Sequence, residues 1–454
     1  MLKEKNMEQY YRVGFGRVDI TPEESVPLAG YGNTSMRFFQ NIRDRIIGNC
    51  VAISDEQNST ILLFDVDLIV MDEPVLGMVR EGITEQYGIA SDRVMICATH
   101  THSGPDIWNS KEPSIVRYHQ LLSSRLIEAA GLALEDRKPA QLLYGTVEIP
   151  NMNFVKHYCH TTADGQTLYF GDNFGTAVYD ETTRHATEND PSFHVLQFKR
   201  QEGLDIVIGN WRAHPHFTSG SKKYDLSADY MGAFRRTLEG MRACHAVFFQ
   251  GCGGNNNSST RLACERRYTT CDSYGMALAA SAVECLEKNM TPAAYGAVKA
   301  KQLWLEYPLD HREDHRVEQA LQVQKVWQET NDHAKVKEVA APYGIRSPYH
   351  ANAIVAKSRR PASKTMEINA MAIGPDVGII TGSEMFDTIS IMTEEASPFA
   401  ATVTMGYCNA YRGYIPSKFG FEYTCYESDV AWFAPGIAEK MIETYIEMLK
   451  ELKN

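Results

Sequence analysis

Two histidines stand two residues apart at the end of an apolar run. His100 and His102 follow Val94–Ala98, and the turn-forming residues Ser103–Pro105 come directly after them. In an extended strand, the side chains of residues i and i+2 point to the same face. Two imidazoles on one face can share a metal ion, or one can bind the metal while the other transfers a proton. Spacing alone fits an ordinary pair of structural histidines equally well.

Further polar residues occur where an apolar run meets a loop of small residues. His214 follows one such run, and His216, two positions later, is a competing ligand. Glu384 emerges from another run across a Gly-Ser pair, and a carboxylate in that place can bind a metal or begin a helix. A tyrosine-rich segment contains Tyr411 and Tyr414, which can pack or reach polar groups. Two histidines and a glutamate form a common catalytic zinc set, with a position left for water or a further ligand.

A loop rich in glycine and asparagine spans Gly251–Ser258. Glycines let the backbone approach a ligand closely, and the N–H groups of such a loop can cradle an anion. The loop is not a dinucleotide fingerprint, because the third glycine is missing and no acidic residue stands at a suitable offset. A plain connecting loop is the alternative. Cys252 within it is either a reactive thiol or a small buried filler, and the filler is favoured.

Apolar strand patterns alternate with helical patterns along the chain, which favours a layered α/β fold. Strands are predicted at residues 60–70, 94–98, 204–208, 246–250, 377–381 and 401–406. Helices are predicted at residues 72–87, 113–134, 228–241, 274–287 and 435–452. We therefore predict a layered mixed β-sheet core flanked by helices. Open α/β sheets bind ligands at strand ends, so the active site is expected at the strand-end loops.

The stretch 309–360 differs in character from the rest of the chain. Asp310–Arg316 opens a charged helical pattern that reaches about Val339. His311 and His315 would share a helical face and could bind a metal, but no glutamate stands between them as the H-E-x-x-H protease motif requires. A solvated helical insertion is the favoured interpretation.

Composition excludes several classes of partner. The 454 residues carry a net charge of −12, which argues against a nucleic-acid partner and against an anionic membrane surface. No run approaches the ~18 apolar residues of a membrane helix, so no integral membrane contact is expected. The first ten residues are polar and lack the apolar region of a secretory signal, which favours a cytoplasmic protein with mostly reduced thiols among its 10 cysteines. We expect residues 1–454 to form one domain, and a homo-oligomer remains open.

The ordered set of these segments resembles the neutral/alkaline, non-lysosomal ceramidases over about residues 11–452. Val13–Pro22 is similar to that family's opening strand, and Ala98–Pro105 matches its most specific signature. Three later segments follow in the family's order, at residues 210–215, 382–386 and 409–415.

This resemblance implies a zinc-dependent hydrolase that cleaves the N-acyl amide of a sphingoid base by attack of metal-activated water. It implies four ligands to one catalytic zinc ion: His100, His214, Glu384 and Tyr414. It further implies that His102 and Tyr426 flank the metal as acid/base and oxyanion groups. Nothing in the spacing alone selects Tyr414 over Tyr411.

The chain departs from the family pattern in three places. Asn257 stands where characterised ceramidases carry a serine, which excludes a serine nucleophile there and makes Asn257 a candidate site residue. The family's active-site arginine is not clearly retained, and Lys156 occupies that region. The immunoglobulin-like domain that ends the long ceramidases is not expected here.

Three functions therefore stay open. The first is a ceramidase-type amidohydrolase acting on a small-molecule or lipid-like N-acyl amide. The second is a metal-dependent amidase or esterase with a smaller polar substrate. The third is a non-catalytic homologue that binds a ligand, which is motivated by Asn257 and Phe154.

Overall fold

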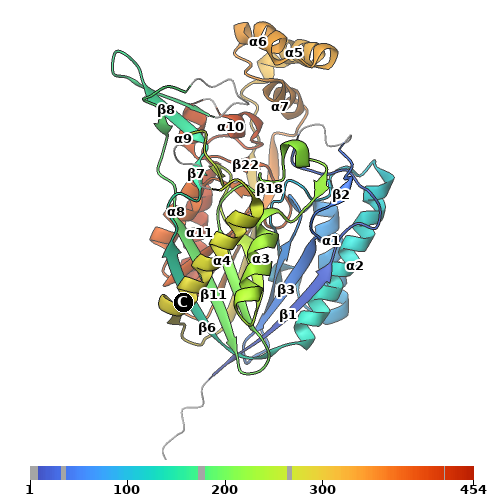
Figure 1. Cartoon of the computed structure of the whole chain (residues 1–454), viewed down its shortest axis with the longest axis vertical. Helices are drawn as coiled ribbons and strands as arrows, with labels where there is room; N and C mark the ends of the chain where they lie inside the picture. The colour runs from blue at the N-terminus through green and yellow to red at the C-terminus, as the bar shows by residue number, and fades with distance from the viewer. Residues whose placement is uncertain (1–8, 32–36, 172–178, 263–267, 424) are drawn as a thin grey trace, which may run out of the picture.

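Two stacked β-sheets, each covered by helices on its outer face, make up the core of the protein (Figure 1). The structure is a computed structural model that describes residues 9–31, 37–171, 179–262, 268–423 and 425–454. Residues 1–8 of the polar N-terminal segment and Cys264 lie outside the described residues.

The larger sheet is mixed and holds most of the N-terminal half of the chain. Its main path runs in the order β14-β12-β11-β6-β1-β3-β4-β5, and β16 (Thr291–Pro292) pairs with β6. The pairs β4–β5 and β12–β14 are parallel, and the other pairs are antiparallel. The strands of the path are β1 (Tyr11–Asp19), β3 (Ile47–Ser54), β4 (Thr60–Val66), β5 (Val94–Ala98), β6 (Lys138–Glu148), β11 (Ser192–Arg200), β12 (Asp205–Trp211) and β14 (Cys244–Gln250).

The smaller sheet has the order β17-β18-β19-β21. Its strands are β17 (Val298–Pro308), β18 (Ser363–Ile373), β19 (Val377–Thr381) and β21 (Ala401–Met405). Only β19 and β21 are parallel.

The alternation of side chains along each strand shows what the two faces of a sheet pack against. Leu62 and Phe64 of β4 pack with the apolar residues of α1 (Glu73–Tyr87) and α2 (Pro113–Glu135), whereas Leu63 packs with residues of the smaller sheet. The other outer helices are α3 (Asp229–Met241) and α4 (Cys271–Lys288) on the larger sheet, with α8 (Asp387–Ala396) and α11 (Ile437–Lys453) on the smaller one. The predicted layered α/β class is therefore confirmed, with two stacked sheets in the centre.

The larger sheet curls, so that its two end strands approach each other. The backbone N–H of Phe248 on β14 donates to Asp65 Oδ2 on β4 at 2.8 Å. Arg235 on α3 donates to Asp65 Oδ2 at 2.9 Å and to Asp67 Oδ2 at 2.6 Å. These buried contacts bring the carboxyl end of β5 close to those of β12 and β14.

Short elements complete the fold above the strand ends. The short strands are β2 (Asn41–Ile42), β7 (Phe154–Val155), β8 (His157–Thr161), β9 (Thr167–Gly171), β10 (Arg184–His185), β13 (Asp225–Leu226), β15 (Asn256–Asn257), β20 (Glu384–Met385) and β22 (Tyr414–Ile415). The remaining α-helices are α5 (Val317–Thr330), α6 (His333–Ala340), α7 (Pro348–Ser358), α9 (Lys418–Glu422) and α10 (Tyr426–Val430).

The charged pattern after Asp310 is helical as expected, but it is divided into two helices. Asn331 adopts a left-handed backbone with φ 47° and ends α5, and Asp332 then caps α6 through the N–H of Ala334. His311 lies in the turn before these helices and bonds to Asp314 at 2.9 Å, so it shares no helical face with His315.

Other expectations about the chain can be compared directly with the described residues. The cysteines among them are all buried and free of disulfides, which agrees with reduced thiols. Burial raises the pKa of Cys252 to about 12, which supports the buried filler over the reactive thiol. None of the helices among the described residues combines the length and apolar character needed to span a bilayer.

Candidate metal centre and active site

Three β-α-β units supply the central residues of the candidate site. His100 follows β5 of the unit β4-α1-β5, and His214 follows β12 of the unit β12-α3-β14. Glu384 follows β19 of the unit β19-α8-β21 in the smaller sheet. Each side chain therefore leaves the carboxyl end of a parallel strand, where α/β sheets place their ligands.

The two histidines and the glutamate converge on one point. Glu384 Oε1 lies 3.2 Å from His100 Nε2 and 3.0 Å from His214 Nε2. The opposite ring nitrogens are fixed by backbone, since Nδ1 of His100 lies 2.7 Å from Ile69 O and Nδ1 of His214 lies 2.8 Å from Gly253 O. A carbonyl oxygen only accepts, so each Nδ1 carries a proton, and each ring turns its Nε2 toward Glu384.

The charge of this cluster favours a cation at its centre. All three side chains are at most 3% exposed. Burial, followed by the nearby Lys156, lowers the pKa of His214 to about 4, so this imidazole is neutral. Burial alone would raise the pKa of Glu384, but the contacts with His100 and His214 hold it well below its ordinary value. Two imidazole nitrogens and a buried carboxylate that face each other form a donor set that suits a divalent metal such as zinc.

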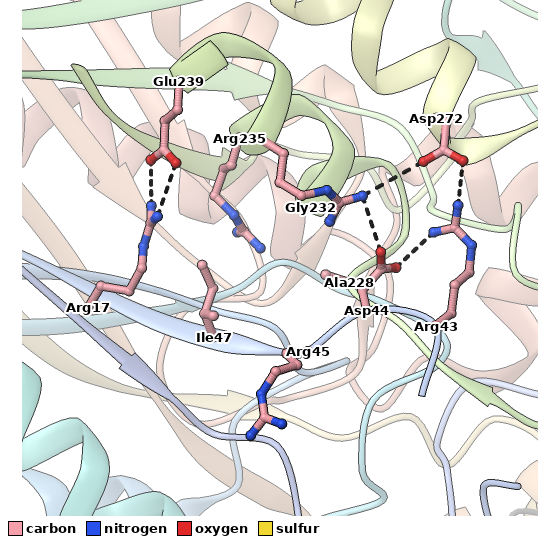
Figure 2. Close-up of a pocket in the computed structure, with 11 residues that line it drawn as sticks. Arg17, Arg43, Asp44, Arg45, Ile47, Ala228, Gly232, Arg235, Glu239 and Asp272 are labelled. Atoms are coloured by element: carbon pink, nitrogen blue, oxygen red, sulfur yellow. Dashed lines mark hydrogen bonds and ion pairs between the residues drawn. The ribbon is translucent and has the colours of Figure 1, made fainter. Parts of the chain in front are cut away.

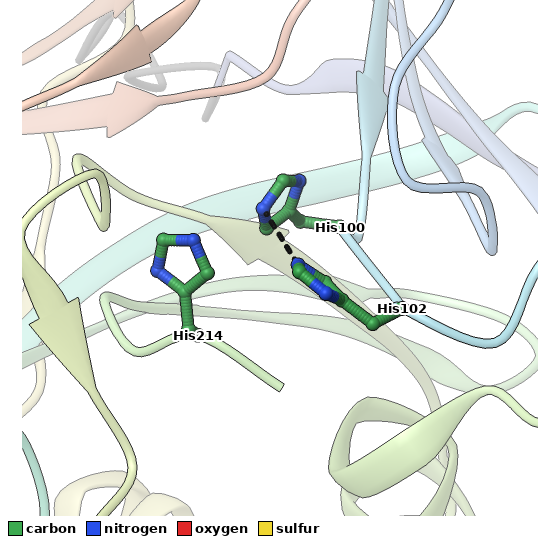
Figure 3. Close-up of side chains that lie close together, drawn as sticks. All are labelled: His100, His102 and His214. Atoms are coloured by element: carbon green, nitrogen blue, oxygen red, sulfur yellow. Dashed lines mark hydrogen bonds between the residues drawn. The ribbon is translucent and has the colours of Figure 1, made fainter. Parts of the chain in front are cut away.

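His102 lies beside this cluster (Figure 3), although His100 has a left-handed backbone and not the extended one that the spacing argument assumed. Its Nε2 is 3.3 Å from His100 Nε2, and His100, His102 and His214 bring possible ligand nitrogens within 4.8 Å of one another. Burial first, and then His216, lowers the pKa of His102 well below its ordinary value. The Nδ1 of His102 is buried and has no hydrogen-bond partner among the described residues. A neutral imidazole with an unused nitrogen is available for proton transfer.

The structure brings both candidate tyrosines to the site. Tyr411 donates its phenol proton to Glu384 Oε2 at 2.6 Å, which leaves Oε1 for the histidines. Tyr414 on β22 is the register partner of Glu384 on β20, and its ring centroid lies 5.9 Å from that of Tyr426. Burial, with Glu384 nearby, raises the pKa of Tyr414 well above its ordinary value.

The asparagines of the Gly251–Ser258 loop have different partners. The side-chain amides of Asn255 and Asn256 donate to the two carboxylate oxygens of Asp387, at 2.7 and 2.9 Å. They hold the first residue of α8, so these two side-chain amides are used within the protein. Asn257 forms an isolated β-bridge with His214. Its buried Oδ1 accepts no hydrogen bond from the described part of the chain.

A buried network of charged and polar side chains behind the tyrosines was not predicted from the sequence. Lys156 Nζ lies 2.7 Å from Glu427 Oε1 and 5.5 Å from the centroid of the Tyr414 ring. The other oxygen of Glu427 lies 2.9 Å from His157 Nε2, and His157 Nδ1 lies 2.6 Å from the Tyr423 hydroxyl. The sequence offered two signals, Lys156 in the region of the family's active-site arginine and Glu427 directly after Tyr426. The structure thus places the cation of Lys156 next to the candidate ligand Tyr414.

Tyr407 is a second residue that sequence reasoning passed over. Its ring stacks on His100 with the centroids 3.8 Å apart and the planes 24° from parallel. Nothing in the pattern of the tyrosine-rich segment distinguishes this tyrosine from its neighbours.

A cavity of about 480 Å³ lies apart from this cluster, beside β1, β3 and α3 (Figure 2). Arginines dominate its lining, but each is paired with a carboxylate. Arg17 binds Glu239, Arg43 binds Asp272, and Arg235 binds the two buried aspartates of the curled sheet. Arg45 and Arg236 are likewise paired, with Asp19 and Asp44. The cavity therefore offers little uncompensated positive charge to an anion.

Known proteins share the sequence pattern and the fold. Residues 11–308 match the N-terminal domain family of neutral/alkaline non-lysosomal ceramidases. The crystal structure of neutral ceramidase from Pseudomonas aeruginosa is similar with a TM-score of 0.73 and 16% identity, covering 98% of this chain and 75% of that chain. A ceramidase complexed with C2 is similar with a TM-score of 0.72 and 16% identity, covering 98% and 76%. The structural likeness shows a shared fold, and the sequence match shows that the chain belongs to the neutral/alkaline non-lysosomal ceramidase family.

Proposed function

We propose that this protein hydrolyses the N-acyl amide bond of a ceramide-like substrate with the help of one zinc ion. The observation that carries the proposal is the convergence of His100 Nε2 and His214 Nε2 on Glu384 Oε1. Family membership supports an amide hydrolase, and the donor set supports the metal. The proposed zinc ligands are those implied by the sequence: His100, His214, Glu384 and Tyr414.

The residues around the cluster can supply the remaining chemistry. A bound zinc ion would lower the pKa of a water molecule from about 15.7 to about 7 and polarise the amide carbonyl. His102 is proposed to accept a proton from the attacking water and to pass it to the leaving nitrogen. A C–O bond then forms to the acyl carbon and the C–N bond breaks, which yields a carboxylic acid and an amine.

Tyr426 and Asn257 are proposed to hold the reacting amide. The phenol of Tyr426 can donate a hydrogen bond to the carbonyl oxygen as negative charge develops on it. Burial raises the pKa of Tyr426 above its ordinary value, so the donor proton is kept at neutral pH. The unused Oδ1 of Asn257, next to His214, can accept from the amide N–H of the substrate.

The test is hydrolysis by the purified full chain, with its metal content measured. Substrates should include ceramides of short and long acyl chain and a small polar N-acyl amino acid. We expect stoichiometric zinc, turnover of a ceramide, loss of turnover with a chelator and recovery when zinc is returned. Cleavage of the polar substrate alone would replace the ceramide proposal with the smaller-substrate alternative. Zinc binding without any turnover would favour the binding homologue.

The cellular location inferred from the sequence is also kept as a proposal. We infer a cytoplasmic protein, and fractionation of cells that express the full-length gene product tests this directly.

A further inference from the structure

Helices α5, α6 and α7 form a unit with an apolar cluster of its own, here called the helical unit. Its buried residues include Val323 of α5, Val336 of α6 and Ile354 of α7, and they are separate from the cores on either side of the sheets. In Figure 1 the unit projects beyond the strand ends, at the same end of the molecule as β22 and α10. The chain enters it after β17 and leaves it before β18, which are paired neighbours.

The helical unit touches the active site through α10. Arg346, just before α7, makes a two-bond ion pair with Asp429 of α10, in which Nε donates to Oδ2 at 3.0 Å and Nη2 donates to Oδ1. Tyr349 of α7 meets Tyr426 of α10 edge to face, with ring centroids 6.2 Å apart and planes at 87°. Both contacts therefore reach the five-residue helix that carries the proposed oxyanion donor.

The ion pair of Arg346 and Asp429 is largely buried and is supported by further hydrogen bonds. The side chain of Asp429 is 5% exposed and that of Arg346 is 30% exposed. The backbone N–H of Arg346 donates to Nδ1 of the buried His350 at 3.2 Å, and His350 Nε2 lies 2.9 Å from Glu313. Bidentate guanidinium–carboxylate pairs fix orientation as well as position.

A helix as short as α10 depends on its neighbours for its position. One turn of helix is unstable alone, because the first hydrogen bond must fix several residues. On α10, Glu427 is held by Lys156 and His157, and the ring of Tyr426 lies 5.9 Å from that of Tyr414. From the helical unit, Arg346 and Tyr349 hold Asp429 and Tyr426 of the same turn.

We propose that the helical unit is a positioning element for catalysis, in which Arg346 and Tyr349 fix Tyr426 over the metal centre. This inference rests on the proposed function of Tyr426. It assigns a task to the stretch 309–360, for which a solvated helical insertion was the interpretation favoured by the sequence.

The first test replaces Arg346 with methionine, which keeps much of the side-chain volume and removes both hydrogen bonds. We expect kcat to fall by about 10- to 100-fold at unchanged zinc content, because misplacing a catalytic group by about 1 Å costs this much. The matched control is Lys325→Met, which removes an exposed ion pair with Glu329 on α5 of the same unit, and its kcat should equal that of wild type. An unchanged kcat in Arg346→Met would overturn the proposal.

The second test separates the ring of Tyr349 from its hydroxyl. Tyr349→Phe keeps the edge-to-face contact and should retain wild-type kcat, whereas Tyr349→Ala removes the contact and should lower kcat about tenfold. Equal activity of the phenylalanine and alanine variants would contradict the positioning role of the ring.

A measurement that does not depend on turnover tests this inference separately from the proposed reaction. Hydrogen exchange of the amides in Tyr426–Val430 should be faster in Arg346→Met than in wild type and in Lys325→Met. If wild type hydrolyses no amide, the proposed function fails, and the exchange result still decides whether the helical unit holds α10. Unchanged exchange together with active wild type refutes the inference alone.

Discussion

His100 shows how much of the site depends on a single residue. Its backbone has φ 65°, the left-handed region that non-glycine residues adopt at a cost of order 1–3 kcal/mol. This turn directs the ring toward Glu384 while Nδ1 remains bonded to Ile69 O. The contacts with Ile69 and Glu384 therefore stabilise the strained backbone of His100 and also orient its ring for a metal.

Substitution of the two neighbouring histidines should separate metal binding from proton transfer. His100→Ala is expected to lose stoichiometric zinc, because one of two fixed Nε2 donors disappears. His102→Ala should keep the zinc and lower kcat by about 10²- to 10⁴-fold, the usual effect of removing a general acid–base group. Metal analysis of both purified variants beside their kcat checks this.

The opposite pattern would reverse the assignment of these histidines. If His102→Ala lost the metal and His100→Ala kept it, His102 would be the ligand. Circular dichroism of both variants serves as the control for folding.

At the scale of elements, β8 and α10 are joined by a buried pair whose strength depends on pH. Burial opposes protonation of His157, but Cys425 and Glu427 outweigh it and raise the pKa of His157 from 6.5 to about 9. The folded protein therefore binds a proton more tightly than the unfolded chain. This stabilisation is complete below pH 6.5 and is lost as pH rises through about 9.

The measurement is urea unfolding of wild type and His157→Gln across this pH range. One pKa unit corresponds to about 1.36 kcal/mol. The difference in free energy of unfolding between wild type and His157→Gln should therefore decrease by about 3 kcal/mol between pH 6.5 and 9. The exposed His333 on α6 offers the control variant His333→Gln, whose profile should follow wild type. A constant difference between wild type and His157→Gln at all pH values would refute the linkage.

At the scale of the whole molecule, the curl of the larger sheet depends on buried charges. Arg235 pairs with Asp65 and Asp67, and the side chains of all three are at most 3% exposed. Arg235→Met would leave two carboxylates buried without their cation, so we expect a loss of about 3–5 kcal/mol in the free energy of unfolding. Chemical denaturation measures this loss.

The control for that prediction is an ion pair at the surface. Arg117 pairs with Glu24, and both side chains are at least half exposed, so Arg117→Met should unfold at the same denaturant concentration as wild type. Equal stability of Arg235→Met and wild type would mean that the curl of the sheet does not depend on these charges.

The sequence by itself determined the elements with strong apolar patterns. The predicted strands at 94–98 and 377–381 coincide with β5 and β19, and Asp72 caps α1 where that helix was expected to begin. The long strand β17 was missed because it is half exposed and interrupted by lysine and glutamine. The predicted strand from residue 60 ends at Val66 rather than residue 70, since the chain turns into the site there.

The residues of the candidate site were also readable in the sequence, because histidines and acids at strand ends are few. His100, His102, His214 and Glu384 were named from their positions, and the structure brings them together. Their meeting was decided only by tertiary structure. The strands that carry His100 and His214 lie near opposite ends of the sheet order, and Glu384 belongs to another sheet, so only the curl and stacking of the sheets join them. Partners such as Lys156 and Glu427 are 271 positions apart in the chain, and no local pattern encodes a contact at that distance.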